Sequence, residues 1–232
     1  MKLTLLHGLS ALPLTLTDGQ VDILCRFGEK LLEKNQVMNL TAITEPPAVA
    51  QLHFLDCLAL LTLADFSEKT VIDVGCGAGF PGVPLKIAEP SIQLTLLDSL
   101  KKRVDWLAQT LPTLGVEAQC VSARAEEYVA GRRESYDFAV SRAVARLNVL
   151  AELCLPFVKP GGYFIAMKSR DSDEEISQAA HAIGLLGGTV EKICDYPIPG
   201  TDAAHRAVLV RKVKKTPAGY PRRFAKIKQS PL

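Results

Sequence analysis

The sequence has no stretch that approaches the roughly 20 consecutive apolar residues of a membrane-spanning helix. Its first apolar run, Met1–Leu16, contains Lys2 and His7, is interrupted by Pro13 and offers no clear cleavage site, so it is a poor signal peptide. With 232 residues, 48% of them hydrophobic, the chain is long enough for one globular core and a small appendage. We therefore expect a cytoplasmic protein that does not contact a membrane.

Metal-binding and disulfide patterns are also missing. No Cys-x-x-Cys pair occurs, and no group of cysteines and histidines has the spacing of zinc ligands. The six cysteines are far apart, and most of them lie in apolar segments, where a reduced cysteine behaves as a small hydrophobic residue. We therefore expect neither a metal site nor a disulfide framework.

Acidic residues are absent from the last 30 positions. Residues 203–232 contain nine of the 27 Lys and Arg but none of the 25 Asp and Glu, so they carry +9 and residues 1–202 carry −7. A basic end on an acidic body favours a polyanionic partner, although a solvated, disordered tail would have the same composition. The residues that could contact RNA phosphates are Arg211, Lys212, Lys214, Lys215, Arg222, Arg223, Lys226 and Lys228.

Hydrophobic periodicity divides the chain into a helical start and a region of alternating strands and helices. Two amphipathic helices, the second beginning at Pro46, are expected in residues 17–64, with a break at Asn35–Thr44. From residue 70, apolar strands alternate with helices, as in a mostly parallel sheet covered on both faces. The expected strands are Thr70–Val74, Gln93–Leu97, Glu117–Val121, Asp137–Val140, Tyr163–Lys168, Thr189–Tyr196 and Ala207–Arg211, and the intervening helices are Pro81–Ala88, Leu100–Leu111, Leu147–Phe157 and Ser172–Leu186.

The last two expected strands are joined by Pro197–Ala204, which is too short to contain a crossover helix. They should therefore pair antiparallel, as a hairpin at the sheet edge. We predict an α/β, Rossmann-like fold with a mostly parallel seven-stranded sheet and an antiparallel edge strand. Its expected divisions are an N-terminal helical extension packed on the core (1–66), the core itself (67–212) and a basic C-terminal tail (213–232).

The first expected strand leads into a glycine-rich loop, residues 75–82, with four glycines in eight residues. Glycines let the backbone approach a ligand closely, and in a doubly wound sheet a nucleotide binds at the end of the first strand. Gly77, Gly79 and Gly82 satisfy the dinucleotide pattern G-x-G-x-x-G, but the match starts late, and Pro81 and Pro84 remove N–H donors that a pyrophosphate would use. The loop therefore favours S-adenosylmethionine, which has no phosphate, and leaves an NAD-dependent oxidoreductase as an alternative.

Charged side chains follow the other expected strands. Asp73, just before the loop, could accept from the ammonium of S-adenosylmethionine directly or through water. Asp98 ends the second strand, where a carboxylate can hold ribose hydroxyls. Glu126 follows the third strand and could accept from an adenine amino group, although a surface carboxylate is the commoner interpretation. Arg142 follows the fourth strand, which in this layout faces the reacting end of the ligand.

Seven segments of the chain match the sequence pattern of one protein family, in the same order along the chain. They are Met38–Ile43, His53–Leu58, Ile72–Gly82, Leu97–Arg103, Ala123–Glu126, Ser141–Ala143 and Tyr220–Arg222. With them the chain resembles, over nearly its whole length, the glucose-inhibited division protein B family, the bacterial guanine-N7 methyltransferases of small-subunit ribosomal RNA. The Asn-Leu-Thr, His-x-Leu-Asp and Tyr-Pro-Arg segments make the resemblance specific. The chain departs from the family at Cys57, where the family usually has Ser, and at Cys76, where it often has Thr. Its C-terminal tail also lacks the glycine that the family usually has there.

The resemblance implies a class I S-adenosylmethionine methyltransferase that acts on N7 of a guanine in 16S (small-subunit) rRNA, either in the free rRNA or in the small ribosomal subunit. We expect a monomer, because nothing in the sequence requires a larger assembly. The resemblance places cofactor contacts at Gly75, Phe80, Asp98, Ala125, Glu126 and Arg142. The loop and strand arguments add Asp73, Gly77 and Gly79.

Guanine N7 carries a free lone pair, so it can attack a sulfonium methyl without first losing a proton. Such an enzyme depends on orientation, and we assign it no catalytic base. The candidates on the substrate side are Asn39, His53, Arg142 and Lys168, and for His53 a buried structural role is equally open. The alternatives are methylation of another RNA, an oxidoreductase, and an RNA-binding module with a vestigial cofactor site.

Overall fold

The computed structural model describes residues 1–142 and 145–232, which form a seven-stranded sheet in the order β3-β2-β1-β4-β5-β7-β6. The strands are β1 (Thr70–Val74), β2 (Gln93–Asp98), β3 (Gln119–Ser122), β4 (Tyr136–Arg142), β5 (Val158–Ser169), β6 (Gly188–Pro197) and β7 (Ala204–Lys212). The first five strands pair in parallel, and β7 runs antiparallel to both β5 and β6. The expected α/β sheet is therefore confirmed.

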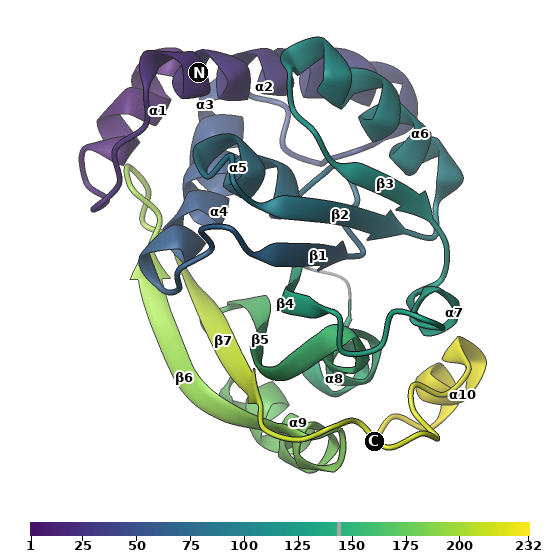
Figure 1. Cartoon of the computed structure of the whole chain (residues 1–232). Coiled ribbons are helices and arrows are strands. Elements are labelled where there is room, and N and C mark those ends of the chain that lie inside the picture. Colours follow the sequence, from purple (N-terminus) through teal and green to yellow (C-terminus); the bar gives the residue numbers. More distant parts are fainter. Residues whose placement is uncertain (143–144) are drawn as a thin grey trace.

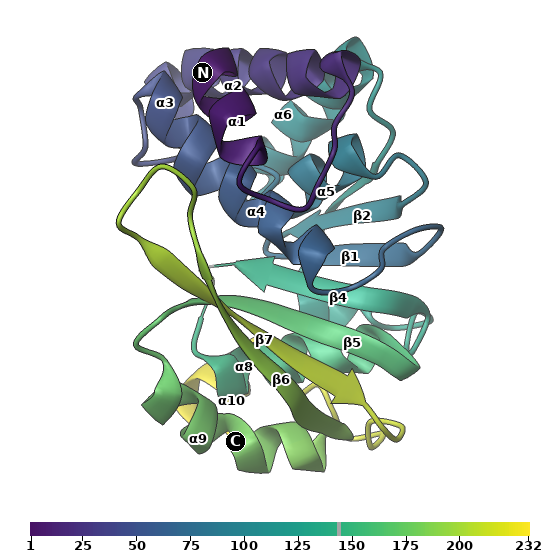
Figure 2. The ribbon, with the colours of Figure 1, turned by 90° about the vertical axis from the view of Figure 1, so that its left-hand side faces the viewer.

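Helices cover both faces of this sheet (Figures 1 and 2). One layer contains α1 (Lys2–Leu9), α2 (Asp18–Met38), α3 (Pro46–Val49), the π-helical η1 (Ala50–Leu55), α4 (Asp56–Leu58), η2 (Ala59–Thr62), α5 (Gly82–Ala88), α6 (Lys101–Thr110) and η3 (Leu111–Leu114). The other contains α7 (Ala125–Tyr128), α8 (Leu147–Cys154), η4 (Leu155–Phe157), α9 (Asp173–Leu185) and α10 (Phe224–Gln229). No helix in the described part of the chain is long and apolar enough to cross a membrane.

The predicted hairpin is present at the sheet edge, but its two strands are arranged in an order that the sequence did not specify. β7 lies one position in from the edge, because it pairs with β5 from Tyr163↔Arg211 to Ser169↔His205, and β6 forms the edge itself. Most residues of β7 are buried, whereas most residues of β6 are exposed. The more apolar strand of the hairpin thus occupies the interior position.

Helix α2 begins at Asp18, with Thr17 as its N-cap. The Thr17 side chain accepts from the Gln20 N–H, and the Gln20 side chain accepts from the Thr17 N–H, which completes a capping box. The helix ends later than expected, at Met38, and Asn39 closes it in the left-handed conformation with φ 49°. The expected break therefore begins four residues further along.

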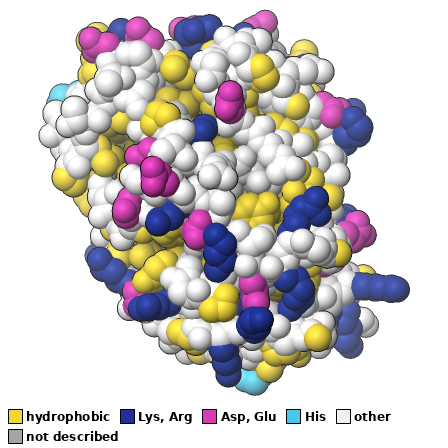
Figure 3. All heavy atoms as spheres, viewed as in Figure 1, with side chains coloured by type: hydrophobic (Ala, Val, Ile, Leu, Met, Phe, Trp, Pro, Cys, Tyr) yellow, Lys and Arg dark blue, Asp and Glu magenta, His cyan; other side chains and the backbone are white. Residues whose placement is uncertain are grey.

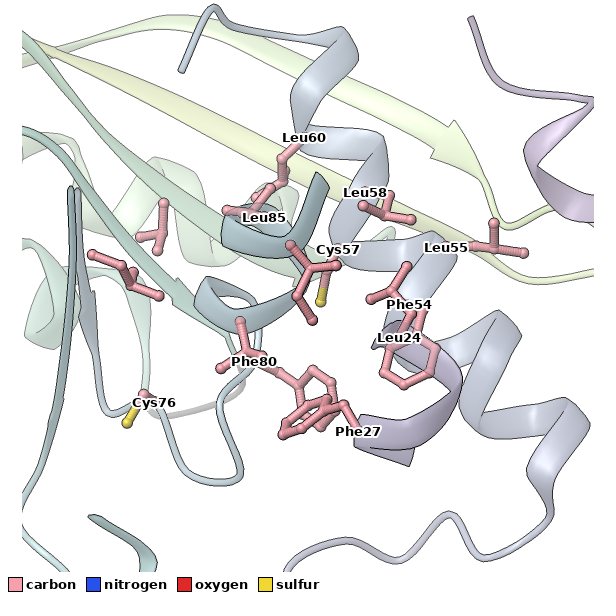
Figure 4. Packing of buried hydrophobic residues seen from close by; sticks show 14 of the residues in the cluster. Leu24, Phe27, Phe54, Leu55, Cys57, Leu58, Leu60, Cys76, Phe80 and Leu85 are labelled. Atoms are coloured by element: carbon pink, nitrogen blue, oxygen red, sulfur yellow. The ribbon is translucent and has the colours of Figure 1, made fainter. Parts of the chain in front are cut away.

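The helical extension shares its core with the sheet. Phe27 of α2 is fully buried and lies beside Phe54 and Phe80 (Figure 4). Its ring centroid lies 5.9 Å from that of Phe80 and 6.3 Å from that of Phe54. The Trp106 ring centroid also lies 5.9 Å away. Aromatic pairs at these distances add to the stabilisation from buried area. Because Phe80 belongs to the glycine loop, this packing connects the extension to the loop. The division at residues 66 and 212 stays a prediction.

Part of the basic C-terminal segment is built into the interior. The fully buried Lys212 ammonium donates to the Leu155 carbonyl and to the Thr216 hydroxyl, both at 2.6 Å. The Arg222 guanidinium pairs with the buried Glu152 carboxylate at 2.6 Å. The prediction that Lys212 contacts RNA is therefore wrong, because its ammonium is buried within the protein. The sequence could not show this, since neither composition nor hydrophobic spacing reveals a buried hydrogen-bonding site. The other predicted cations, Arg222 apart, are exposed.

Candidate active site

A cavity of about 470 Å³ opens at the carboxyl ends of β1, β2 and β4, within the size range of small-molecule sites. It is lined by Leu40, Thr41, His53, Val74, Gly75, Cys76, Gly77, Ala78, Phe80, Leu97, Asp98, Ser99, Leu100, Arg103, Ala123, Arg124, Ala125, Glu126, Arg142, Leu153 and Phe224. These residues come from the helical extension, the strand ends, α7 and the C-terminal segment. The cavity is therefore formed only when all of these parts are assembled.

The glycine loop is held at the cavity by the end of β2. Gly75 and Gly77 have φ of 75° and 56°, a region that is disfavoured for residues with a Cβ. The Gly75 N–H donates to the Leu97 carbonyl at 2.8 Å. The Asp98 carboxylate accepts from the Gly77 N–H at 2.9 Å and, through its other oxygen, from the Leu100 N–H at 2.8 Å. Each oxygen has a further lone pair, so Asp98 can still accept from a ligand.

Seven of the predicted cofactor residues line the cavity, namely Gly75, Gly77, Phe80, Asp98, Ala125, Glu126 and Arg142. Asp73 and Gly79 do not. Asp73 is fully buried behind the loop, where it accepts from the Gly82 N–H at 2.8 Å, and burial raises the pKa of its carboxyl to about 7. A Cβ on Gly79 would lie 2.6 Å from the Val83 side chain, so this glycine permits close packing of the loop on the helices.

Arg142 and His53 form a hydrogen-bonded pair in the cavity wall. Arg142 Nη2 lies 2.9 Å from His53 Nδ1, and the imidazole stacks on the Phe80 ring at 4.4 Å between centroids. His53 Nε2 lies 2.8 Å from the Thr41 hydroxyl. Desolvation, followed by the charge of Arg142, lowers the pKa of His53 to about 3, so the ring is neutral at physiological pH. His53 therefore combines the two roles left open from the sequence, since it is buried and lines the cavity.

Asp56 supports this pair from behind. Its carboxylate accepts from Arg142 Nη1 at 3.1 Å, and its other oxygen accepts from the Tyr196 hydroxyl at 2.9 Å and lies 2.9 Å from His205 Nδ1. The hydrogen bond to Asp56 raises the pKa of His205. The extension, β4 and the β6–β7 hairpin thus meet at one buried carboxylate.

The other two substrate-side candidates lie outside the cavity. Asn39 is exposed, although the next two residues, Leu40 and Thr41, line the wall. Lys168 donates to the Glu175 carboxylate at 2.6 Å and to the Ala145 carbonyl at 2.7 Å, so its charge is neutralised within the protein. Ala143, part of the family resemblance, lies outside the described residues.

Three further residues that line the cavity, Arg103, Arg124 and Phe224, were not predicted from the sequence to contact the cofactor. Arg103 lies in the first turn of α6, and Arg124 immediately precedes α7. The Arg124 guanidinium lies 5.0 Å from the centroid of the Phe224 ring, which the C-terminal segment brings to the cavity. The two arginines stand out in the sequence as basic residues. Nothing in the sequence indicated that Phe224, near the C-terminus, lies beside the residues that follow β1, β2 and β3.

The side chains that line the cavity suit a nucleoside with a charged amino-acid end. Asp98 and Glu126 offer carboxylates to hydroxyl and amino groups, the left-handed glycines leave the loop backbone open, and Phe80 and Phe224 offer aromatic surface. Within the described residues, no cluster of His, Cys, Asp or Glu has the geometry of a metal site.

Solved structures of other proteins share this fold. The chain superimposes on an S-adenosylmethionine-dependent methyltransferase from Aquifex aeolicus with a TM-score of 0.53 and 17% identity, covering 72% of this chain and 94% of the other. A precorrin-6y C5,15-methyltransferase from Geobacter metallireducens gives a TM-score of 0.52 at 13% identity, covering 68% and 87%. The fold is thus that of the class I methyltransferases, as predicted.

The sequence comparisons identify the family within this class. The GidB family, described as rRNA small subunit methyltransferase G, matches residues 20–197. Ribosomal RNA small subunit methyltransferase G of Alkaliphilus oremlandii is 46% identical over 100% of this chain and 99% of its own length. The same enzyme of Clostridium botulinum is 44% identical over 94% and 93%. The chain therefore belongs to the GidB family, which confirms the resemblance found in the sequence.

Proposed function

We propose that this protein transfers a methyl group from S-adenosylmethionine to N7 of a guanine in small-subunit rRNA. The observation that carries the proposal is the single cavity in which the glycine loop and Asp98 meet the His53–Arg142 pair. Membership of the GidB family supports the choice of reaction over the oxidoreductase and the RNA-binding module.

S-adenosylmethionine would supply a methyl group that its sulfonium charge makes electrophilic. The Asp98 carboxylate would accept from the ribose hydroxyls, and Ala125 and Glu126 would border the adenine. Gly75 and Gly77 would bring their backbone close to the cofactor, and Asp73 would hold the loop through Gly82. Phe80 and Arg142 would border the amino-acid end and the incoming base.

No lining group is needed as a base, because guanine N7 has a free lone pair. The His53 ring is an unsuitable base, since Arg142 occupies Nδ1, Thr41 occupies Nε2, and its pKa is lowered to about 3. Both its neighbours and its stacking on Phe80 fix the orientation of the ring. This chain would thus accelerate transfer by positioning the two reactants and excluding water.

The RNA would be held by exposed cations. Figure 3 shows Lys and Arg side chains at the lower right of the face, where α7 and α10 lie in Figure 1. The exposed cations of this region include Arg124, Arg223, Lys226 and Lys228. Neutralising RNA phosphates releases counterions, which favours binding at low salt. We propose a monomer that works in the cytoplasm, where small ribosomal subunits are assembled.

The direct test is methyl transfer from labelled S-adenosylmethionine to small ribosomal subunits that lack the modification. The product is then mapped by cleavage at 7-methylguanine. One cleaved guanine would establish the donor, the substrate and the reacting atom. If S-adenosylhomocysteine stabilises the protein but neither subunits nor their free rRNA accept a methyl group, the rRNA assignment is wrong.

A further inference from the structure

The Thr41 hydroxyl occupies an unusual position in the cavity wall, because its neighbours determine the direction of its proton. A guanidinium can only donate, so His53 Nδ1 must accept from Arg142 Nη2 at 2.9 Å. A neutral imidazole carries one proton, which must therefore be on Nε2. His53 Nε2–H then donates to Thr41 Oγ1 at 2.8 Å.

Thr41 Oγ1 also accepts from the Ile43 N–H at 3.0 Å. A hydroxyl oxygen has two lone pairs and one proton, and both lone pairs are now used. No acceptor among residues 1–142 and 145–232 takes the remaining proton at hydrogen-bonding distance. Since Thr41 lines the cavity, this hydroxyl is available there as a donor and cannot act as an acceptor.

The backbone of Thr41 is fixed as well. Asn35 of α2 donates from Nδ2 to the Thr41 carbonyl at 2.9 Å and accepts from the Thr41 N–H through Oδ1 at 2.9 Å. A donor that is held at both backbone and side chain loses little freedom when it meets a ligand. It can therefore discriminate between ligands that differ in one acceptor.

We propose that the Thr41 hydroxyl donates a hydrogen bond to O6 of the substrate base and thereby selects guanine over adenine. The inference rests on the proposed guanine-N7 reaction and adds the group that recognises the base. Guanine presents two neighbouring acceptors, N7 and O6, whereas adenine presents an N6 amino donor in place of O6. Because N7 reacts with the methyl group, O6 is the acceptor of guanine that remains for a hydrogen bond. In adenine, a group that can only donate would meet the N6 amino donor, and the two could not form a hydrogen bond.

The test compares substrate RNAs whose target position carries guanine or 2,6-diaminopurine, which has an amino group in place of O6 and no proton on N1 but presents the same N7. Wild-type transfer to guanine is established first, because its absence would overturn both the proposed function and this inference. We expect the wild-type kcat/KM to be at least 10-fold higher for guanine. Equal values for the two bases would overturn the inference without affecting the proposed function.

The variants then locate the discrimination. Thr41→Val keeps the shape of the side chain but removes the hydroxyl, and it should lower kcat/KM for guanine roughly 10-fold and reduce the preference for guanine by a similar factor. Thr41→Ser should retain the preference. Stabilisation by S-adenosylhomocysteine, measured for each variant, checks that the cofactor site is intact. A folded Thr41→Val protein with wild-type preference would overturn the inference.

Discussion

The Asp56 carboxylate accepts a hydrogen bond from the Arg142 guanidinium at 3.1 Å, although the two residues are 86 positions apart. Asp56 lies in the helical extension and Arg142 at the end of β4. The same carboxylate accepts a hydrogen bond from the Tyr196 hydroxyl of the β6–β7 hairpin. Because Arg142 in turn orients His53, this buried contact sets the shape of the cavity wall.

Removing the Asp56 carboxylate should therefore be costly. Asp56→Ala leaves a largely buried guanidinium without its counter-charge, and such changes lower the free energy of unfolding by about 3–5 kcal/mol. Tyr196→Phe, which removes one hydrogen bond to the same carboxylate, should cost about 1 kcal/mol. Urea denaturation measures both. Similar small losses for the two variants would show that the contact with Arg142 adds little stability.

Asp98→Ala should abolish the stabilisation of the protein by S-adenosylhomocysteine. The substitution removes the proposed ribose acceptor and also releases the N–H groups of Gly77 and Leu100. At a ligand concentration of 100 times Kd, the wild type should gain about 2.7 kcal/mol. Asp105→Ala, which removes an exposed carboxylate paired with Lys101, is the matched control and should keep the shift. An unaltered shift in Asp98→Ala would contradict the ribose assignment.

Asp73 should make stability depend on pH. Burial raises the pKa of its carboxyl from 3.8 to about 7 in the folded protein. The folded state therefore holds this proton more tightly, so the contribution is complete below pH 4 and is lost as the pH rises to 7. Relative to the wild type, Asp73→Asn should gain up to about 4 kcal/mol between pH 4 and 8, because it has no proton to lose. Denaturation curves at several pH values measure this difference, and a constant difference would contradict the assignment.

The exposed cations of α10 should govern the salt dependence of RNA binding. Replacing Lys226 and Lys228 together by Ala should reduce the slope of log K against log salt by about 1.5, if each side chain neutralises one phosphate. Lys192→Ala, an exposed cation on the edge strand β6, is the control and should leave the slope unchanged. Binding of small-subunit rRNA across a salt series supplies the slopes. Equal slopes for the wild type and the double variant would place the RNA elsewhere.

Much of the fold could be predicted because its signals are local. Apolar runs such as Val71–Val74 mark buried strands, Pro46 marks a helix start, and the glycines of residues 75–79 mark a loop. A parallel sheet then brings the strand ends together. Asp98, Glu126 and Arg142 were assigned to one site on that basis, and all three line the cavity.

The predictions that went wrong or proved incomplete concern contacts between distant segments. Lys212 has the composition of a surface cation, but its ammonium is surrounded by groups from η4 and the loop after β7. Lys168 lies at the expected strand end, yet α9 supplies Glu175 beside it. Phe224 reaches the cavity only because α10 packs against α8. No periodicity in the sequence encodes these partners.

The sequence by itself determined the sheet, the glycine loop, the family and the charged residues at the strand ends, because each depends on neighbouring residues or on a motif. The tertiary structure decided which of those charges remain free for a ligand. The glycine loop and the residues after β2 use only one lone pair of each Asp98 oxygen, and packing of the extension and the hairpin on the sheet places Arg142 against Asp56 and His53. A buried charge must find its partner within the fold, and that partner is set by three-dimensional packing rather than by position along the chain.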